Sequence, residues 1–235
     1  MNWISLIPVR SGSKGIPNKN VRLVCGKPLY RHTVDFALNA GTNQIYITTD
    51  IQEILTSPKE RKIVTIKRKK NLCGDDTLIS SVILDFLNGP EGMKISDDQI
   101  IVLLQVTSPL RQKVDLLKAL NRFTTLSDVD LMMAVTEAEN HALKYGYIVD
   151  GKFRHISEPR LCFENRQNLP KLFKPTGGFY IFKAGWYRAN KSLATMSTGT
   201  YELSQRDSLD IDSFVDLERF EAILNKKGLP RENSK

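Results

Sequence analysis

The sequence has few of the residues that build metal clusters, disulfide frameworks or membrane spans. Three cysteines and three histidines occur in 235 residues, and their wide separation gives neither a zinc-site spacing nor a disulfide framework. No apolar run approaches the roughly 20 residues that cross a bilayer, and the first residues do not have the pattern of a secretory signal. We therefore expect a protein of a reducing compartment, the cytoplasm, with no membrane partner.

Acidic residues are also in the minority, at 26 against 34 lysines and arginines, which gives a formal charge of +8. Such an excess suits nucleic acid, an anionic membrane or a small anionic ligand. The basic residues are spread along the chain except in the run Lys67–Lys70, which we interpret as a solvated strand end. Because no nucleic-acid recognition motif accompanies them, we favour a small anionic ligand.

Short apolar runs alternate with amphipathic helical patterns, and Ile100–Leu104 is apolar throughout, as in a strand buried on both faces. This alternation predicts an α/β fold with a mainly parallel sheet and helices on both faces. We expect strands at Trp3–Val9, Gln44–Thr49, Lys62–Ile66, Gln99–Gln105, Val129–Val135 and Gly178–Phe182. We expect helices at Pro28–Asn39, Thr77–Asn88, Lys113–Thr125 and Ser213–Lys227.

The polar stretch 138–173 interrupts this alternation, and Asp150-Gly151 predicts a hairpin turn within it. We interpret the stretch as an excursion from a single domain that spans residues 1–235. A lid, an oligomer contact and a plain surface loop system are all compatible with this pattern.

The loop after the first expected strand gathers cations and glycines without an acid. Gly12 and Gly15 allow the backbone to approach a ligand closely, and the cations Arg10, Lys14 and Lys19 suit phosphate oxygens. The pattern is neither the dinucleotide fingerprint nor a Walker A loop. A turn with solvated lysines is the alternative, but the density of cations favours polyphosphate and hence a nucleotide-using enzyme. The loop reads Arg10-Ser-Gly-Ser-Lys-Gly-Ile-Pro-Asn-Lys-Asn20.

Two carboxylates, Asp210 and Asp212, flank Ile211, and in an extended segment such side chains point the same way. Paired carboxylates suit Mg²⁺ or Mn²⁺, and a metal there would bridge to a triphosphate. Capping of the following helix by Asp210, Asp212 or Ser213 is the alternative, and Asp216 is expected to be solvated. A glycosyltransferase or another metal-dependent nucleotidyltransferase could use the same pair.

A third group of polar residues lies near the expected strand at Gly178–Phe182 and after the central strand. Arg166 and Lys174 precede a Gly-Gly pair, and because arginine binds carboxylates through two hydrogen bonds, an acidic co-substrate is indicated. Gln105 follows the central strand, at the edge where open α/β sheets bind their ligands. It is a candidate to contact a base or a sugar.

In combination, these segments resemble the acylneuraminate cytidylyltransferase family, the CMP-sialic acid synthetases. The resemblance spans nearly the whole chain in the expected order, and the combination is specific although each part alone is not. The related ketodeoxyoctonate cytidylyltransferases resemble the chain less, because their first loop lacks the Ser-Lys-Gly…Lys-Asn form. The matching segments are Arg10–Asn20, Thr48–Asp50, Leu104–Arg111, Arg166–Pro170, Phe173–Gly177 and Asp207–Asp212.

The resemblance implies a Rossmann-like nucleotidyltransferase fold and a homodimer in which the excursion reaches over the partner. It implies that CTP and a nine-carbon 2-keto sugar acid give a CMP-sugar and pyrophosphate, with Mg²⁺. It assigns catalysis to Arg10, Lys14, Lys19 and Asp212, and the metal to Asp210 and Asp212. It assigns the nucleotide to Arg10, Gly12, Ser13, Lys14, Asn20, Thr77 and Ser80, and the sugar acid to Gln105, Lys144, Arg166, Lys174 and Tyr180.

Three departures from the family pattern lie in the implied sugar pocket. Lys174 stands where the family often has arginine, and Thr176 and Gly178 replace the asparagine and alanine of its Pro-Asn-Gly-Ala segment. Lysine offers a point charge where arginine offers a planar fork. Neuraminic, legionaminic and pseudaminic acids are therefore all open as the substrate.

Overall fold

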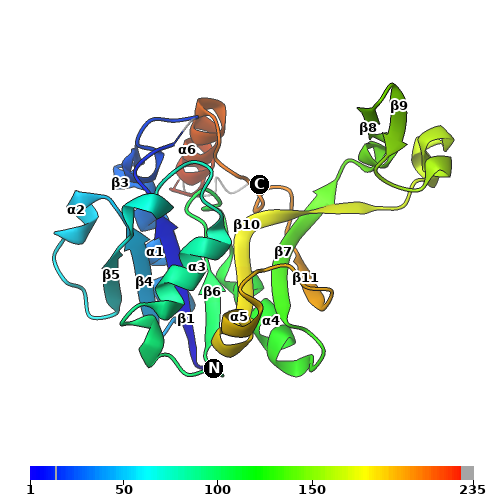
Figure 1. The fold of residues 1–235 in the computed structure, drawn as a ribbon. Coiled ribbons are helices and arrows are strands. Elements are labelled where there is room, and N and C mark those ends of the chain that lie inside the picture. Colours follow the sequence, from blue (N-terminus) through cyan, green and yellow to red (C-terminus); the bar gives the residue numbers. More distant parts are fainter. Residues whose placement is uncertain (14, 229–235) are drawn as a thin grey trace, which may run out of the picture.

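A seven-stranded sheet forms the centre of the molecule, with helices on both of its faces (Figure 1). The structure is a computed structural model, and it describes residues 1–13 and 15–228. The strand order is β11-β7-β10-β6-β1-β4-β5. Strand β10 runs antiparallel to both neighbours, and the other four pairings are parallel. The predicted α/β fold with a mainly parallel sheet is thus confirmed. The strands are β1 (Trp3–Val9), β4 (Gln44–Thr49), β5 (Ile63–Lys67), β6 (Ile100–Leu103), β7 (Leu131–Ala138), β10 (Leu172–Lys183) and β11 (Thr198–Glu202).

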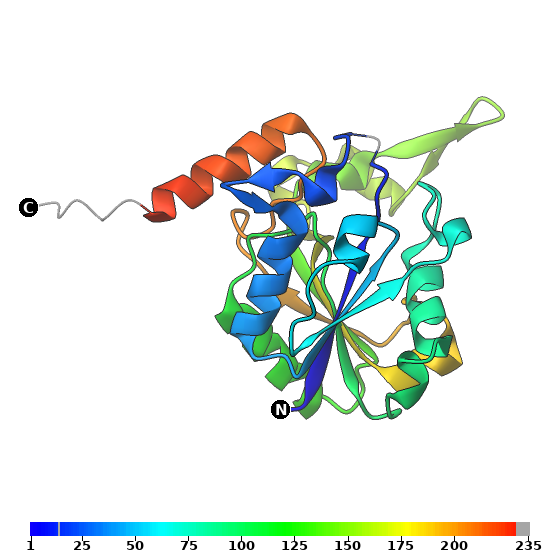
Figure 2. The same cartoon turned by 90° about the vertical axis from the view of Figure 1, so that its left-hand side faces the viewer.

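Two hydrophobic layers hold the helices to the sheet. On β1, Ile7 and Val9 pack with one set of helices, whereas Ile4 and Leu6 pack with the other, because alternate residues of a strand face opposite sides. Figure 2 shows α1 and α6 on one side of the sheet and α3 and α5 on the other. The first layer contains α1 (Leu29–Ala40), α4 (Lys113–Thr125) and α6 (Phe214–Gly228), and the second contains α3 (Ile79–Asn88) and α5 (Ala184–Asn190).

Several short elements connect this framework. They are η1 (Lys19–Val21), the hairpin of β2 (Leu23–Val24) and β3 (Lys27–Pro28), α2 (Gln52–Leu55), η2 (Lys70–Leu72) and η3 (Gly92–Lys94). None of the helices in the described part of the chain is long and apolar enough to cross a membrane.

Some elements and boundaries differ from the expectation. Strand β11 was not expected, because its sequence Thr198–Glu202 has no apolar alternation, and it is placed by parallel pairing with β7. Helix α5 was also not expected. Strand β10 begins at Leu172 rather than at Gly178, and α3 begins at Ile79 because Leu78 is extended, with φ −66° and ψ 136°.

Between β7 and β10 the chain leaves the sheet, and we call residues 139–171 the arm. The two strands continue outward as an antiparallel ribbon that carries the arm away from the body (Figure 1). The predicted turn at Asp150-Gly151 is confirmed, since both residues have positive φ, at 50° and 70°. The arm comprises η4 (Asn140–Lys144), β8 (Gly146–Val149), β9 (Lys152–His155), η5 (Pro159–Phe163) and η6 (Arg166–Asn168).

Candidate active site

A pocket of about 300 Å³ lies beyond the carboxyl ends of β1 and β6. Ligands of open α/β sheets bind at this edge. The pocket gathers Arg10, Gly12, Ser13, Asn20 and Thr77 from the predicted nucleotide residues. Ser80 is not among its lining residues, and its carbonyl accepts a hydrogen bond from Tyr187. The lining residues are Pro8, Arg10, Gly12, Ser13, Lys19, Asn20, Arg68, Leu72, Thr77, Ile79, Val82, Gln105, Val106, Thr107 and Asp212.

The first loop is fixed at both ends by side-chain hydrogen bonds. Ser11 donates its backbone N–H and its hydroxyl to Asp50 at the end of β4, over 2.8 and 2.5 Å. Burial acts to raise the pKa of Asp50, but the hydrogen bonds from Ser11 outweigh it and hold the pKa below its ordinary value of 3.8. Asn20 donates to the Arg10 carbonyl over 2.8 Å. These contacts orient the loop at the pocket.

Two cations of the loop are engaged by acids from distant parts of the chain. The Arg10 guanidinium lies 2.6 Å from Asp75 Oδ1, in the segment between η2 and α3. Lys19 is buried and donates to the Ile211 carbonyl over 2.6 Å and to Asp212 Oδ1 over 3.1 Å. Lys14 lies outside the described residues, so its role stays a prediction.

The two carboxylates of the segment Asp210–Asp212 are exposed on either side of the buried Ile211. The Ile211 N–H donates to the Thr107 carbonyl over 2.8 Å, which ties this segment to the loop after β6. Asp210 Oδ1 accepts from the Ser108 hydroxyl over 3.2 Å. Within the described residues, no group of three or more histidine, cysteine or acidic side chains could hold a metal, so this pair would need ligand oxygens to complete a metal shell.

Asp216 lies in α6 and is partly exposed, and it also caps the start of this helix. Its carboxylate accepts from the Ser213 N–H over 2.8 Å and from the Asp212 N–H over 3.2 Å. Ser213 Oγ lies 2.7 Å from the same carboxylate and 3.4 Å from the Asp216 N–H. This reciprocal pair is the capping box of a helix start. The carboxylates of Asp210 and Asp212 make other contacts instead.

An irregularity in β10 brings Gly177 against the loop after β6. The register with β7 shifts between Pro175 and Tyr180. A Cβ atom on Gly177 would lie 2.4 Å from both Gln105 Oε1 and Ser108 Oγ. A larger residue would push these two side chains away, so Gly177 allows the Gln105 side chain to lie at the pocket edge.

Arg111, which is buried, satisfies the carbonyl groups exposed by this irregularity. Its guanidinium donates to the carbonyl groups of Gln105, Gly177 and Gly178, and to Thr33 Oγ1 over 3.2 Å. Burial acts to lower the pKa of Arg111, and the charge of Asp210 opposes that shift. From the sequence, Arg111 was noted only as the last residue of the matching segment Leu104–Arg111. Its long reach to β10 depends on the tertiary fold.

The predicted sugar-acid residues divide into two groups. Gln105 lines the pocket, and Tyr180 pairs with Leu103 of the neighbouring strand. Burial, followed by the charge of Asp210, raises the pKa of Tyr180. Lys144 and Arg166 instead belong to the arm, where Lys144 donates to the Glu164 carbonyl.

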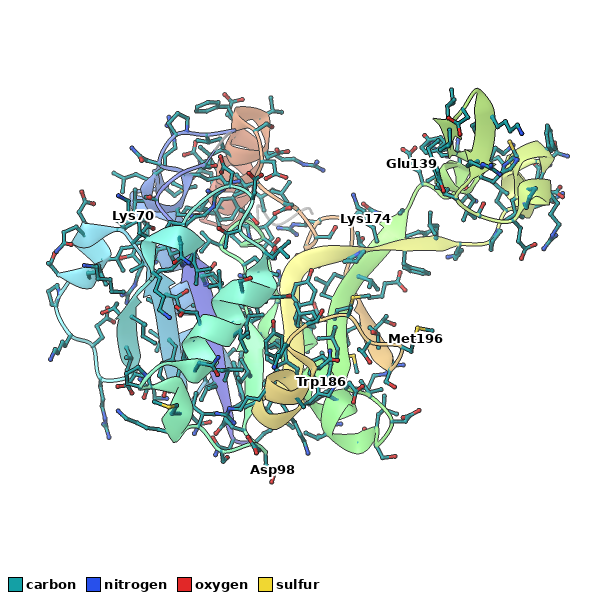
Figure 3. The ribbon with its side chains drawn as sticks, in the orientation of Figure 1. Lys70, Asp98, Glu139, Lys174, Trp186 and Met196 are labelled. Atoms are coloured by element: carbon teal, nitrogen blue, oxygen red, sulfur yellow. The ribbon has the colours of Figure 1, made fainter. Side chains whose placement is uncertain are left out.

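Lys174 lies on the ribbon that leads to the arm, apart from the pocket beyond β1 and β6. Figure 3 shows Lys174 on β10 at the base of the ribbon, Glu139 out on the arm and Lys70 on the far side of the body. Lys174 and Arg166 line a second cavity of about 1260 Å³ between the ribbon and the arm. The structure therefore separates Lys144, Arg166 and Lys174 from the pocket beyond β1 and β6 of their own chain.

Arg68 is a pocket residue that sequence reasoning missed. Its guanidinium donates to the Thr48 carbonyl and hydroxyl over 2.8 and 3.0 Å, and burial lowers its pKa. Its Nε has no hydrogen-bond partner within the described residues. The run Lys67–Lys70 was interpreted as a solvated strand end, which is wrong for Arg68. A basic residue directly after an expected strand was the available indication.

Comparison with curated proteins shows the same resemblance. N-acylneuraminate cytidylyltransferase of Streptococcus agalactiae serotype III is 33% identical over 224 residues, with 91% of this chain and 51% of that protein covered. The chain thus spans about half the length of this relative. CMP-N,N'-diacetyllegionaminic acid synthase of Legionella pneumophila is 28% identical, with 92% of this chain and 93% of that protein covered. Pseudaminic acid cytidylyltransferase of Campylobacter jejuni serotype O:2 is 26% identical, with 96% and 97% covered.

Solved structures share the fold. A CMP:2-keto-3-deoxy-manno-octonic acid synthetase complexed with CTP superposes with a TM-score of 0.67 at 16% identity, with 97% of this chain and 100% of that chain covered. The predicted Rossmann-like nucleotidyltransferase fold is thereby confirmed. The family model described as Cytidylyltransferase matches residues 4–224. The protein therefore belongs to the cytidylyltransferase family.

Proposed function

We propose that the protein transfers CMP from CTP to a nonulosonic acid of the sialic type and releases pyrophosphate. The single observation that carries the proposal is the pocket in which Lys19 joins the first loop to the segment Asp210–Asp212. The cations of the first loop and Asp212 are thereby adjacent. The names of the three reported relatives, each a synthase or cytidylyltransferase for such an acid, support the same chemistry.

On the nucleotide side, Arg10, Lys14 and Lys19 would neutralise the triphosphate. The backbone groups of Gly12 and Ser13 would approach its oxygens. The unpartnered Nε of Arg68 is a donor that suits a carbonyl oxygen of the pyrimidine. The anomeric hydroxyl of the sugar acid would attack the α-phosphorus in line as pyrophosphate leaves. Catalysis would then consist of positioning and charge neutralisation.

Asp210 and Asp212 are our proposed Mg²⁺ ligands. Both carboxylates are exposed, and their side-chain contacts within the described residues use Oδ1 of each. Magnesium typically takes one or two carboxylates together with substrate phosphates and water, which fits this donor set, and Mn²⁺ accepts similar ligands. When bound, the metal would neutralise charge on the phosphate chain.

The sugar acid would bind between Gln105 and Tyr180 on one chain and cations supplied by a second copy. Lys144, Arg166 and Lys174 lie away from the nucleotide pocket of their own chain. A homodimer in which the arm of one copy reaches the pocket of the other would unite the two groups.

Exposed apolar side chains on the arm support this homodimer. Ile148 and Phe163 are 76% and 86% exposed, and large exposed apolar patches mark interaction sites. Further exposed apolar residues of the arm are Tyr145, Tyr147, Val149, Phe153 and Ile156. We expect Ile148→Asp to sediment as a monomer in analytical ultracentrifugation. We also expect this variant to have reduced activity. Met196→Asp, at an exposed position away from the arm, is the matched control, and a dimer of unchanged affinity in Ile148→Asp would contradict the arm-mediated contact.

The test of the proposed reaction is pyrophosphate release from CTP, UTP, ATP and GTP with a panel of neuraminic, legionaminic and pseudaminic acids. We expect release only with CTP and one class of acid. Equal rates with UTP would contradict the proposal. Consumption of a nucleotide sugar without pyrophosphate release would favour the glycosyltransferase alternative.

The cysteines Cys25, Cys73 and Cys162 are free thiols, which supports the cytoplasm as the compartment.

A further inference from the structure

The ion pair between Arg10 and Asp75 connects two segments that line the pocket. Arg10 follows β1 and lines the pocket with Gly12, whereas Asp75 belongs to segment 73–78, whose Thr77 also lines it. The two side chains are 30% and 32% exposed, so the pair lies at the surface rather than in the core. The Arg10 guanidinium is the group that the proposed function assigns to the phosphates. The Asp75 carboxylate therefore already forms an ion pair with the cation that a phosphate would bind.

Segment 73–78 is largely exposed, at Gly74, Asp75, Asp76 and Leu78. Gly74 and Thr77 form a turn with one 3.2 Å backbone hydrogen bond, and Leu78 is 72% exposed. Segments with few buried apolar contacts open at low cost in free energy. Movement of this segment would carry Asp75 away from Arg10 without disturbing the core.

We propose that Asp75 is an internal competitor for Arg10, which a phosphate chain must displace when it binds. The inference rests on the proposed function, because it takes Arg10 as a phosphate ligand. Carboxylate and phosphate oxygens both accept charge-assisted hydrogen bonds from a guanidinium, so one anion exchanges for the other. The competition lowers the affinity for ligands that reach Arg10 and leaves ligands without phosphate unaffected. It also favours release of pyrophosphate, since Asp75 can return to Arg10.

The test is the affinity of Asp75→Asn for CTP, pyrophosphate and cytidine, measured by isothermal titration calorimetry. An ion pair at the protein surface stabilises the contact between its two side chains by up to about 1 kcal/mol. If a ligand must break the pair, this energy corresponds to roughly fivefold in affinity. We therefore expect CTP and pyrophosphate to bind about two- to fivefold more tightly and cytidine to bind equally. Asp76→Asn removes the same charge from the neighbouring exposed position and controls for the general electrostatic field.

A double-mutant cycle separates competition from other effects. In an Arg10→Ala background, Asp75→Asn should no longer change the affinity for CTP, because the two residues act on each other. Weaker or unchanged CTP binding by Asp75→Asn would overturn the proposal. An equal gain in Asp76→Asn, or a gain that persists without Arg10, would do the same. If the wild-type protein bound neither CTP nor pyrophosphate, the proposed function itself would fail, which is a distinguishable result.

Discussion

Lys19, near the start of the chain, lies with its ammonium group 3.1 Å from Asp212 Oδ1, near the end of the chain. The same ammonium group donates to the Ile211 carbonyl over 2.6 Å. Lys19 is buried, while the Asp212 side chain is 77% exposed. The lysine therefore anchors the segment and leaves the carboxylate accessible to a ligand.

We predict that Asp212→Asn lowers turnover about a hundredfold or more and raises the Mg²⁺ requirement, as losses of single electrostatic groups do. Asp216→Asn should instead lower stability by roughly 1 kcal/mol, because it weakens the cap of α6. Steady-state kinetics over a Mg²⁺ titration, together with thermal denaturation, separates the two effects. Full activity of Asp212→Asn at low Mg²⁺ would show that the carboxylate does not hold the metal.

Gly15→Ala should disturb the contact between the first loop and Asp212. A Cβ at Gly15 would lie 2.2 Å from the Asp212 carbonyl oxygen, so the backbone must shift. We expect a loss of about 1–3 kcal/mol in stability, as for other overpacked sites, together with a lower kcat/KM. Gly74→Ala is the control, because its Cβ would be 3.7 Å from Thr77 Oγ1. A Gly15→Ala protein with the wild-type melting temperature would contradict the close approach.

Arg10→Ala should weaken the chemical step more than CTP binding. Arg10 follows β1 at the pocket edge, where its charge would oppose the negative charge that builds on the departing pyrophosphate. Loss of an interaction made mainly in the transition state lowers kcat and kcat/KM together. A role confined to binding would raise the KM for CTP alone. A folded variant with wild-type kinetics would refute both roles.

Asp50 should make the protein's stability sensitive to acid. Its folded-state pKa lies below the ordinary value of 3.8, so its contribution is present above about pH 4 and is lost as the pH falls through the folded pKa. Asp50→Asn should therefore lower stability near neutral pH and flatten its decline below pH 4. Urea unfolding from pH 2 to pH 7 measures this change. Asp98→Asn, which removes a 95% exposed carboxylate, is the control, and parallel curves for wild type and Asp50→Asn would contradict the prediction.

Local patterns in the sequence determined the framework of the fold. Apolar residues predominate in Trp3–Val9 and fill Ile100–Leu104, and both runs predicted central strands because such runs need burial on both faces. The turn at Asp150-Gly151 was predictable for another local reason, since these residues accept positive φ. The cation-rich first loop predicted a ligand pocket, and Arg10, Gly12, Ser13 and Asn20 line the pocket beyond β1 and β6. That this pocket takes a nucleotide stays a proposal.

Only the tertiary structure decided which residues meet across the chain. No local pattern connects Lys19 with Asp212, or Arg10 with Asp75, because long-range pairing depends on the order and direction of the strands. The same is true of β10, whose antiparallel insertion between β6 and β7 carries Arg166 and Lys174 away from the pocket beyond β1 and β6. The sequence by itself determined residue types and local conformations, whose causes are short-range. The tertiary packing decided their neighbours, because burial and charge pairing are satisfied only when the whole sheet is assembled.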